Sequence, residues 1–303
     1  MLLYRLIKRN ILVYCRDRSN IFFSLLSMLI IIGLMVVFLG KMNADSVIDL
    51  LSQYGGERDT TFDRSNAEQL VMLWTLAGIV VVNSVTITLS MVGIMVEDEA
   101  QKRLSSFFVA PVSRWIFVLS YVVAAIIMGI IMCTLTVVIG EAYIVITGGS
   151  MINLAVLGRV FLYIVLNVFT SGAMVFLIAN FVHSQSAFGG LSTIIGTLVG
   201  FLSGIYLPLG MLPEKLQGVL KCFPLLHGCS IMRDLLTKDI LAKTFEGYPE
   251  ELISAYKEAM GISILYEGEV ASITNQVAFL LISGIIFIGI AVLLQRKKNV
   301  MSR

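Results

Sequence analysis

The stretch "EDEAQKRLSSFFVAPVSRW", from Glu97 to Trp115, is a short polar segment inside an apolar chain. On each side of it the chain runs for more than 25 residues without a charged side chain, over 69–96 and 115–140. Apolar stretches of about 18 or more residues are long enough to cross a bilayer as a helix. We therefore expect a polar connection between two membrane spans.

The composition of the whole chain is typical of a membrane protein. Its 303 residues are 57% hydrophobic and only 14% charged, whereas soluble domains carry about 25% charged residues. The net charge of +2 is small, and no basic, aromatic-rich patch indicates a nucleic-acid partner. We expect an all-α integral membrane protein whose partners include membrane lipids but no nucleic acid.

The charge-free windows predict six transmembrane helices. The run at 160–213 is interrupted only by His183 and is too long for one crossing, so we expect it to fold back there. The predicted spans are 19–40, 70–96, 115–146, 155–181, 187–207 and 272–294. The predicted layout is thus an interfacial segment, 1–18, followed by a six-span domain, 19–303.

The Lys and Arg residues predict the orientation. Twelve of them lie in 1–18, in 97–114 and after Gln295, on one side of the predicted membrane. Because short cytoplasmic loops are rich in Lys and Arg, we expect both termini in the cytoplasm and the long 208–270 loop outside. The expected location is the cell membrane, most simply a bacterial plasma membrane.

Residues 1–18 show helical spacing of apolar and basic side chains. The apolar positions are Leu3, Leu6, Ile7, Ile11 and Tyr14, and the basic positions opposite are Arg5, Lys8 and Arg9. This pattern predicts an amphipathic helix in the cytoplasmic interface, with its basic face near anionic headgroups. A plain basic anchor that obeys the positive-inside rule is the alternative.

The 97–110 segment is expected to form a cytoplasmic helix of about three turns that Pro111 ends. Glu97, Asp98 and Glu99 would lie at its start, where the helix dipole favours acids. Leu104, Phe107 and Phe108 cluster at helical spacing and form an apolar surface. A helix that lies on lipid would carry more basic residues, so a protein partner is favoured.

Sequence motifs for catalysis are not found in the chain. It has no GxxxxGK[ST] nucleotide loop and no nucleophile or metal-ligand pattern, so no catalytic residue and no metal site is expected. Ion-coupled carriers usually place charges near the membrane midplane, and the span interiors here hold almost none. Cys222 and Cys229 lie seven residues apart, too far to bridge on one helix, so free buried thiols are expected.

Two charges lie near the predicted spans, Glu141 and Arg159. Each is nine residues from Ser150, at the turn of a predicted helical hairpin, so both are expected at similar depth. We hypothesise a structural ion pair between them. The alternative is that Glu141 senses substrate at the outer exit.

Glycine and proline mark the region around the fifth span. Gly196, Gly200 and Gly204 recur at spacing four, which favours close helix packing within the subunit or, slightly preferred, between subunits. Residues 201–236 stay apolar despite three Pro residues, which is typical of short helices that re-enter the outer leaflet. In the polar 237–269 segment, a small extracellular helix is expected between Pro249 and Gly261.

Two motif regions carry a resemblance to a known family. They are 97–114, which ends in "VAPVSR", and 201–233, with the pattern F-x-SG-x-x-x-P…LP…P-L…R. In this order of spans they resemble the permease subunit of type-2 ABC exporters. The family often has Gly-Thr-Leu-Glu before Pro-Val-Ser, whereas this chain has Ser105 at the acidic position, so the acids of 97–99 would take that role.

The resemblance implies a complex and a set of site residues. Two permease subunits, as a homo- or heterodimer, would form the pathway above two separate ABC ATPase subunits, which would bind ATP and Mg²⁺, while this chain binds no cofactor. The Gly196, Gly200 and Gly204 stripe would lie at the subunit interface, and an extracellular gate would include Pro208, Pro213, Pro224 and Arg233. The ATPase-coupling residues would be Glu97, Asp98, Glu99, Leu104, Phe107, Phe108 and Pro111.

The expected function is export of amphipathic substrates, such as a drug, an antimicrobial peptide or a lipid, powered by the partner ATPase. Its 15 Met and 17 Phe residues suit adaptable apolar recognition. A permease for a cell-surface polysaccharide or teichoic acid is the alternative within this class. A non-transporting membrane sensor or scaffold is the alternative outside it.

Overall fold

The computed structural model describes the chain except at residues 1, 20, 23–25, 27–28, 31–32, 34–39, 54–59, 102, 104–113, 183, 267 and 302–303. Side chains are described over the same residues, apart from those at 40–42, 53, 60–62, 114–115 and 295–301.

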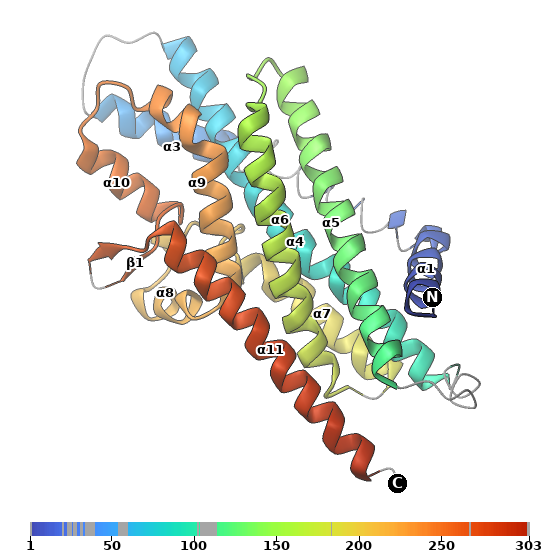
Figure 1. The fold of residues 1–303 in the computed structure, drawn as a ribbon. Helices are drawn as coiled ribbons and strands as arrows, with labels where there is room; N and C mark the ends of the chain where they lie inside the picture. The colour runs from blue at the N-terminus through green and yellow to red at the C-terminus, as the bar shows by residue number, and fades with distance from the viewer. Residues whose placement is uncertain are drawn as a thin grey trace.

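Within the described residues, five helices are long and apolar enough to cross a membrane. They are α4 (Thr60–Ala100), α5 (Arg114–Ile146), α6 (Leu154–Ala179), α7 (Gln185–Leu202) and α11 (Ile273–Met301), shown in Figure 1. A helix satisfies its own backbone hydrogen bonds, which is why an apolar chain crosses lipid in this form. The sequence prediction of an all-α membrane protein is confirmed.

Helix α4 is the centre of the bundle. It packs against α5, α6, α7 and α9 (Pro224–Thr244), and Ile79, Val80 and Val85 on it are fully buried. Helices α5 and α6 form an antiparallel hairpin that packs beside α4. The central helix therefore contacts α1, α5, α7 and α9, which carry or precede most residues of the two polar clusters described below.

The two ends of the bundle are distinct. At one end, called here the terminal end, α4 and α6 finish, α5 and α7 begin, and the C-terminus lies (Figure 1). At the opposite end lie α3 (Gly40–Gln53), the α5–α6 turn and the last turns of α9. Helix α3 packs on the first turns of α4 through Ala44, Val47 and Leu51.

The third, fourth and sixth predicted spans agree with the candidate membrane helices of the structure to within two residues at each end. The second span is longer than expected, because α4 runs without a break to Ala100. The fifth is shorter, because α7 ends at Leu202 and not at 207. The first predicted span, 19–40, lies largely outside the described residues.

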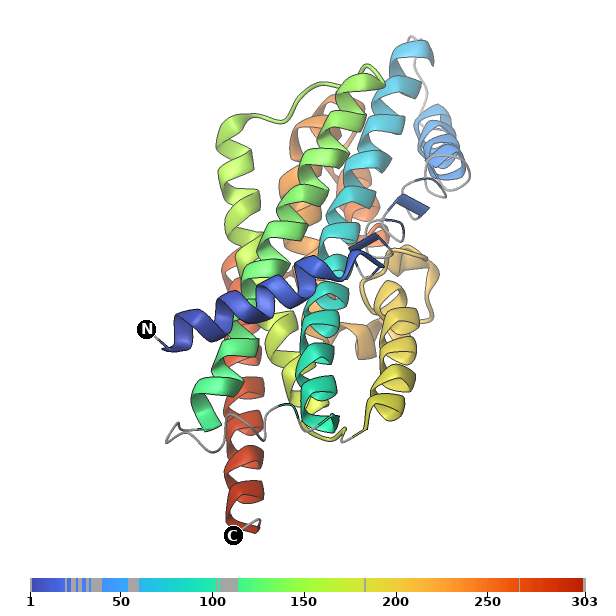
Figure 2. The same ribbon diagram turned by 90° about the vertical axis from the view of Figure 1, so that its right-hand side faces the viewer.

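Helix α1 (Leu2–Arg16) crosses the bundle obliquely near the terminal end (Figure 2). It packs on α5 and touches α4. Leu6, Asn10 and Tyr14 point inward and are buried. The expected amphipathic helix is present, and one of its faces is covered by protein.

Between α7 and α11 the chain forms a set of short elements at the side of the bundle. They are η3 (Leu209–Met211), α8 (Glu214–Lys221), α9, α10 (Glu250–Ala259) and a hairpin of β1 (Leu265–Tyr266) and β2 (Glu269–Val270), in which Leu265 faces Val270. Proline precedes or begins η3, α8, α9 and α10, where a missing N–H costs nothing. The helix predicted between Pro249 and Gly261 is confirmed as α10, and Gly261 ends it with φ +62°.

Candidate functional site

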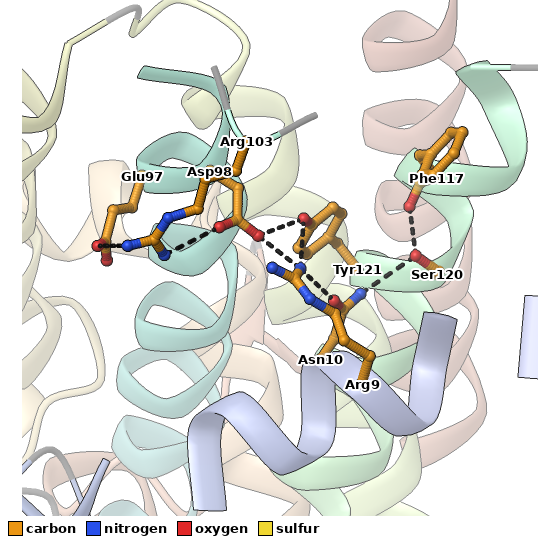
Figure 3. Close-up of polar contacts among 8 residues, drawn as sticks. All are labelled: Arg9, Asn10, Glu97, Asp98, Arg103, Phe117, Ser120 and Tyr121. Carbon is orange, nitrogen blue, oxygen red and sulfur yellow. Dashed lines mark hydrogen bonds and ion pairs between the residues drawn. The ribbon is translucent and has the colours of Figure 1, made fainter. Parts of the chain in front are cut away.

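A polar cluster at the terminal end joins three helices (Figure 3). The Arg9 guanidinium of α1 lies 2.5 Å from the Asp98 carboxylate of α4 and donates to the Tyr121 hydroxyl of α5 at 3.0 Å. Tyr121 in turn donates to Asp98 at 2.6 Å. These three side chains close a ring of hydrogen bonds, called here the inner cluster.

Neighbouring side chains extend the inner cluster in two directions. Asn10 donates to the Ser120 hydroxyl at 3.1 Å, which adds a second link between α1 and α5. On the other side, Arg103 lies 3.3 Å from Asp98 and 3.7 Å from Glu97. Asp98 thus receives three donors, from α1, from α5 and from the connection after α4.

Burial makes these contacts strong. The Asp98 side chain is 1% exposed, whereas the Arg9 side chain is 33% exposed. A buried carboxylate is stable only when donors compensate its lost hydration. Burial alone would lower the pKa of Arg9, but its hydrogen bonds to Asp98 and Tyr121 and their charges raise it above its ordinary value.

The sequence prediction for the three acids is wrong in one respect. Glu97, Asp98 and Glu99 do not begin a new helix, because they form the last turn of α4. A helix C-terminus disfavours acids, and the bonds from Arg9 and Arg103 offset this at Asp98. Leu104, Phe107, Phe108 and Pro111 lie outside the described residues, and their coupling role stays a prediction.

The prediction for Arg9 is also wrong. The sequence pattern grouped it with Arg5 and Lys8 on a face toward lipid headgroups. Arg5 and Lys8 are exposed, but Arg9 turns to Asp98. No local signal gives this contact, because the two residues are 89 positions apart.

A second cluster, called here the outer cluster, surrounds Arg233 of α9, whose side chain is completely buried. Its guanidinium donates to the carbonyl of Gly204 at 2.9 Å and to that of Met260 at 3.4 Å. It also lies 4.1 Å from the centre of the Trp74 ring of α4. The Trp74 indole N–H donates to the same Met260 carbonyl at 2.7 Å.

The two clusters are separated by a distance that matches a bilayer. Gly78, next to the Arg233 guanidinium, and Asp98 are about 20 residues apart on α4, which corresponds to about 30 Å along a helix. The hydrocarbon core of a bilayer is about 30 Å thick. Both polar clusters therefore fit at the two faces of one membrane, joined by the same helix.

The predicted glycine stripe is only partly helical. Gly196 and Gly200 lie on α7, but Gly204 follows the helix with φ +62°. The amides of Gly204 and Ile205 bond back to the carbonyls of Phe201 and Gly200, which is a Schellman end. A Cβ on Gly200 would lie 2.1 Å from the Tyr206 ring of the same chain, whereas Gly196 has open space around it.

The predicted ion pair between Glu141 and Arg159 is wrong. Glu141 is 7% exposed and accepts a hydrogen bond from the Ile152 amide at 2.6 Å, which closes the α5–α6 turn. Arg159 is exposed, and the structure shows no ion pair of it with Glu141. The equal spacing from Ser150 predicted a similar depth in the membrane for both residues. It did not predict which face of α5 carries Glu141 or which face of α6 carries Arg159.

The proline and cysteine residues that the sequence analysis singled out lie at the side of the bundle. Pro208, Pro213 and Pro224 begin or precede η3, α8 and α9, and only Arg233 of the predicted gate enters the outer cluster. Cys222 and Cys229 are free thiols, the first exposed and the second buried. Cys222 was expected to be buried, and that expectation is wrong.

Several residues of the two clusters were not predicted from the sequence. Asn10, Ser120, Tyr121 and Trp74 were not singled out there, yet each makes a hydrogen bond in or beside one of the clusters. The available signal was a polar or aromatic residue on the inward face of an otherwise apolar helix. Met260 acts through its carbonyl, so its side-chain type carries no signal.

Comparison with known proteins gives one family and no curated relative. The family model described as ABC-2 type transporter matches residues 1–237. A comparison with curated proteins finds no match. The matched range includes Arg9, Asp98 and Arg233 but not Met260.

The match covers more than half of the chain and both polar clusters except for the turn after α10. Its members are transmembrane permease domains that are not themselves catalytic and that work with ABC ATPases. The chain therefore belongs to the ABC-2 type transporter family and is a permease subunit of an ABC transporter.

Proposed function

We propose that this permease exports amphipathic substrates, such as a drug, an antimicrobial peptide or a lipid, out of the cell. Two separate ATPase subunits bind ATP and Mg²⁺ and supply the energy, and a second permease subunit completes the pathway. The terminal end of the bundle faces the cytoplasm, in agreement with its Lys and Arg residues. The 15 Met and 17 Phe residues of the chain suit adaptable recognition of apolar substrates.

The inner cluster is the observation that most supports coupling of this permease to a separate ATPase. Asp98 is near the end of α4 and Tyr121 is near the start of α5, so the cluster bridges the two sides of the 101–113 connection. Arg9 adds α1 to the same ring. A force applied to the connection would therefore move three helices as one unit.

The connection itself supplies the proposed ATPase contact. Phe107 and Phe108 offer apolar surface in a polar segment at the proposed cytoplasmic face, which suits a protein partner better than a lipid surface. Leu104 and Pro111 complete the contact, and Glu97 and Glu99 flank it. The proposed exit at the other face contains Arg233 with the three proline-led elements, η3, α8 and α9.

The proposed subunit interface rests on α7. Gly196 has open space around it within the chain, and the neighbouring Ile194 and Leu198 are exposed. Small residues on an exposed helix face permit close helix approach in lipid. Gly200 and Gly204 contribute to the end of α7 and not to this surface.

A double substitution tests the coupling. Phe107→Ala with Phe108→Ala should abolish ATP-dependent transport of a fluorescent amphipathic dye in proteoliposomes, while ATPase activity and membrane insertion remain. The matched control is Phe161→Ala with Phe181→Ala, because both side chains are exposed Phe residues outside the connection. Unchanged transport in the first variant would remove the coupling role from 104–113.

A further inference from the structure

Arg233 is a buried cation with an unusual set of partners. Its side chain is fully buried, yet within the described chain no carboxylate lies within ion-pair distance of it. Burial lowers the pKa of Arg233, and the neighbouring Cys229 thiol, whose pKa burial raises to about 11, is neutral at pH 7 and supplies no compensating charge. Buried arginines are normally paired with an acid or a phosphate, so these partners require a separate explanation.

Backbone carbonyls take the place of the acid. The two acceptors belong to two turns, one after α7 at Gly204 and one after α10 at Met260. Each turn contains a glycine with φ +62°, Gly204 and Gly261. A Cβ at Gly261 would lie 3.2 Å from the guanidinium, and one at Gly78 would lie 3.4 Å from it, so small residues make room for the cation.

The turn after α10 is held at more than one point. Met260 accepts from Trp74 as well as from Arg233. The Ser230 hydroxyl donates to the Ile262 carbonyl at 2.8 Å. Since Met260 and Ile262 lie beyond the range that the family model matches, these bonds attach a later segment to the matched part of the chain.

We propose that Arg233 is a positioning residue that holds both turns, 203–207 and 260–262, on α4 while the exit is closed, and that releases them together when it opens. When Arg233 separates from the two turns, its guanidinium and the two carbonyls become hydrated by water. No buried carboxylate loses its partner in this step. The hydrogen bonds of Arg233 therefore fix the positions of both turns while the site excludes water. They can break at low cost when water enters the site. The proposal rests on the proposed export function.

Hydrogen exchange in the purified permease–ATPase complex tests the closed state. The reporters are the Ile205 amide, bonded to the Gly200 carbonyl, and the Ile262 amide, bonded to the Lys257 carbonyl. Without nucleotide, Arg233→Met should raise exchange at both by about tenfold or more. Trp74→Phe, which removes the indole bond to Met260 and keeps an aromatic ring beside Arg233, should raise exchange at Ile262 alone.

The control is Arg64→Met, because Arg64 is an exposed arginine on the same α4 with only surface ion pairs. It should change neither reporter. Unchanged exchange at both reporters in Arg233→Met, or a rise at Ile262 alone, would overturn the proposal. If Arg233→Met does not fold, Arg233→Lys replaces it: a rise at both reporters supports the proposal, and wild-type exchange at both overturns it.

Release during transport is tested separately. In the unmodified complex, ATP turnover should raise exchange at Ile205 and Ile262 together, and constant exchange would overturn the release step. Arg233→Met should keep ATPase activity but lower dye transported per ATP, and Arg233→Lys should restore part of it. An unmodified complex without ATP-driven transport refutes the export function, whereas the nucleotide-free exchange result still decides whether Arg233 holds the two turns.

Discussion

Replacement of Arg9 by Met should loosen α1 from the bundle. The substitution keeps much of the apolar stem of Arg9 and removes the guanidinium that contacts Asp98 and Tyr121. Asp98 would retain the Tyr121 hydroxyl at 2.6 Å and Arg103 at 3.3 Å. The carboxylate would therefore stay buried with two donors instead of three.

The magnitude follows from the burial of the two partners. A hydrogen bond to a charged group contributes about 1.5–3 kcal/mol, and removing one member of a buried ion pair costs about 3–5 kcal/mol. Arg9 is 33% exposed, so water screens part of this interaction and the expected loss is about 2 kcal/mol. That loss corresponds to a change of about 30-fold in the opening equilibrium of α1.

Hydrogen exchange of the α1 amides is the assay. Lys8→Met is the matched control, because Lys8 is the adjacent residue and is exposed. Arg9→Met should raise exchange in α1 about 30-fold, and Lys8→Met should leave it unchanged. Equal exchange in the two variants would refute the inner cluster as the anchor of α1.

A double-mutant cycle adds a second test of the same pair. Asp98→Asn keeps an acceptor oxygen for Tyr121 and Arg9. On its own it should therefore raise hydrogen exchange in α1 less than Arg9→Met does. The combined variant should lose about 1–2 kcal/mol less than the sum of the single losses, because the two changes remove one shared interaction. Additive losses would show that Arg9 and Asp98 act independently.

Three further outcomes check other parts of the structure. Gly200→Ala places a Cβ 2.1 Å from the Tyr206 ring, so thermal unfolding should show a loss of about 1–3 kcal/mol; an unchanged melting temperature would contradict this packing. Glu141→Ala should lower the free energy of unfolding by about 1 kcal/mol, because it removes the hydrogen bond from the Ile152 amide. Arg159→Ala should leave this free energy unchanged, and equal decreases in the two variants would indicate an ion pair between Glu141 and Arg159. Burial lowers the pKa of His227 below 6.5, so the folded state disfavours protonation of this side chain. The free energy of unfolding should therefore decrease as the pH drops below about 6.5. In His227→Gln, the difference between the melting temperatures at pH 5 and pH 7.5 should be smaller, and an unchanged difference would contradict this role of His227.

Features set by composition were predictable from the sequence. The apolar runs predicted the third, fourth and sixth spans to within two residues at each end, because a long apolar chain in lipid satisfies its backbone hydrogen bonds as a helix. Pro249 and Gly261 marked α10 through backbone rules that act locally. These signals do not depend on what the segment contacts.

Features set by the exact end of a helix were not predictable. The spacing of Gly196, Gly200 and Gly204 forms a stripe only if α7 continues, and it ends at Leu202. The three acids at 97–99 suit a helix start, yet α4 reaches Ala100 because partners far along the chain offset the unfavourable dipole.

Contacts between distant helices were also beyond the sequence. Arg9 and Asp98 are ordinary members of a basic and an acidic group in the one-dimensional pattern. Only the crossing of α1 over α5 brings them together. The outer cluster shows the same limit, because Arg233 bonds to carbonyls, which every residue type provides.

We propose that a separate ATPase drives transport through this permease. The most direct measurement is dye accumulation in proteoliposomes that contain the permease and its co-purified ATPase, with ATP, without ATP, and with a non-hydrolysable analogue. Transport should require ATP hydrolysis and should disappear in the Phe107→Ala with Phe108→Ala variant. Transport that continues without ATP, or a permease that purifies with no ATPase bound, would contradict this role of the ATPase.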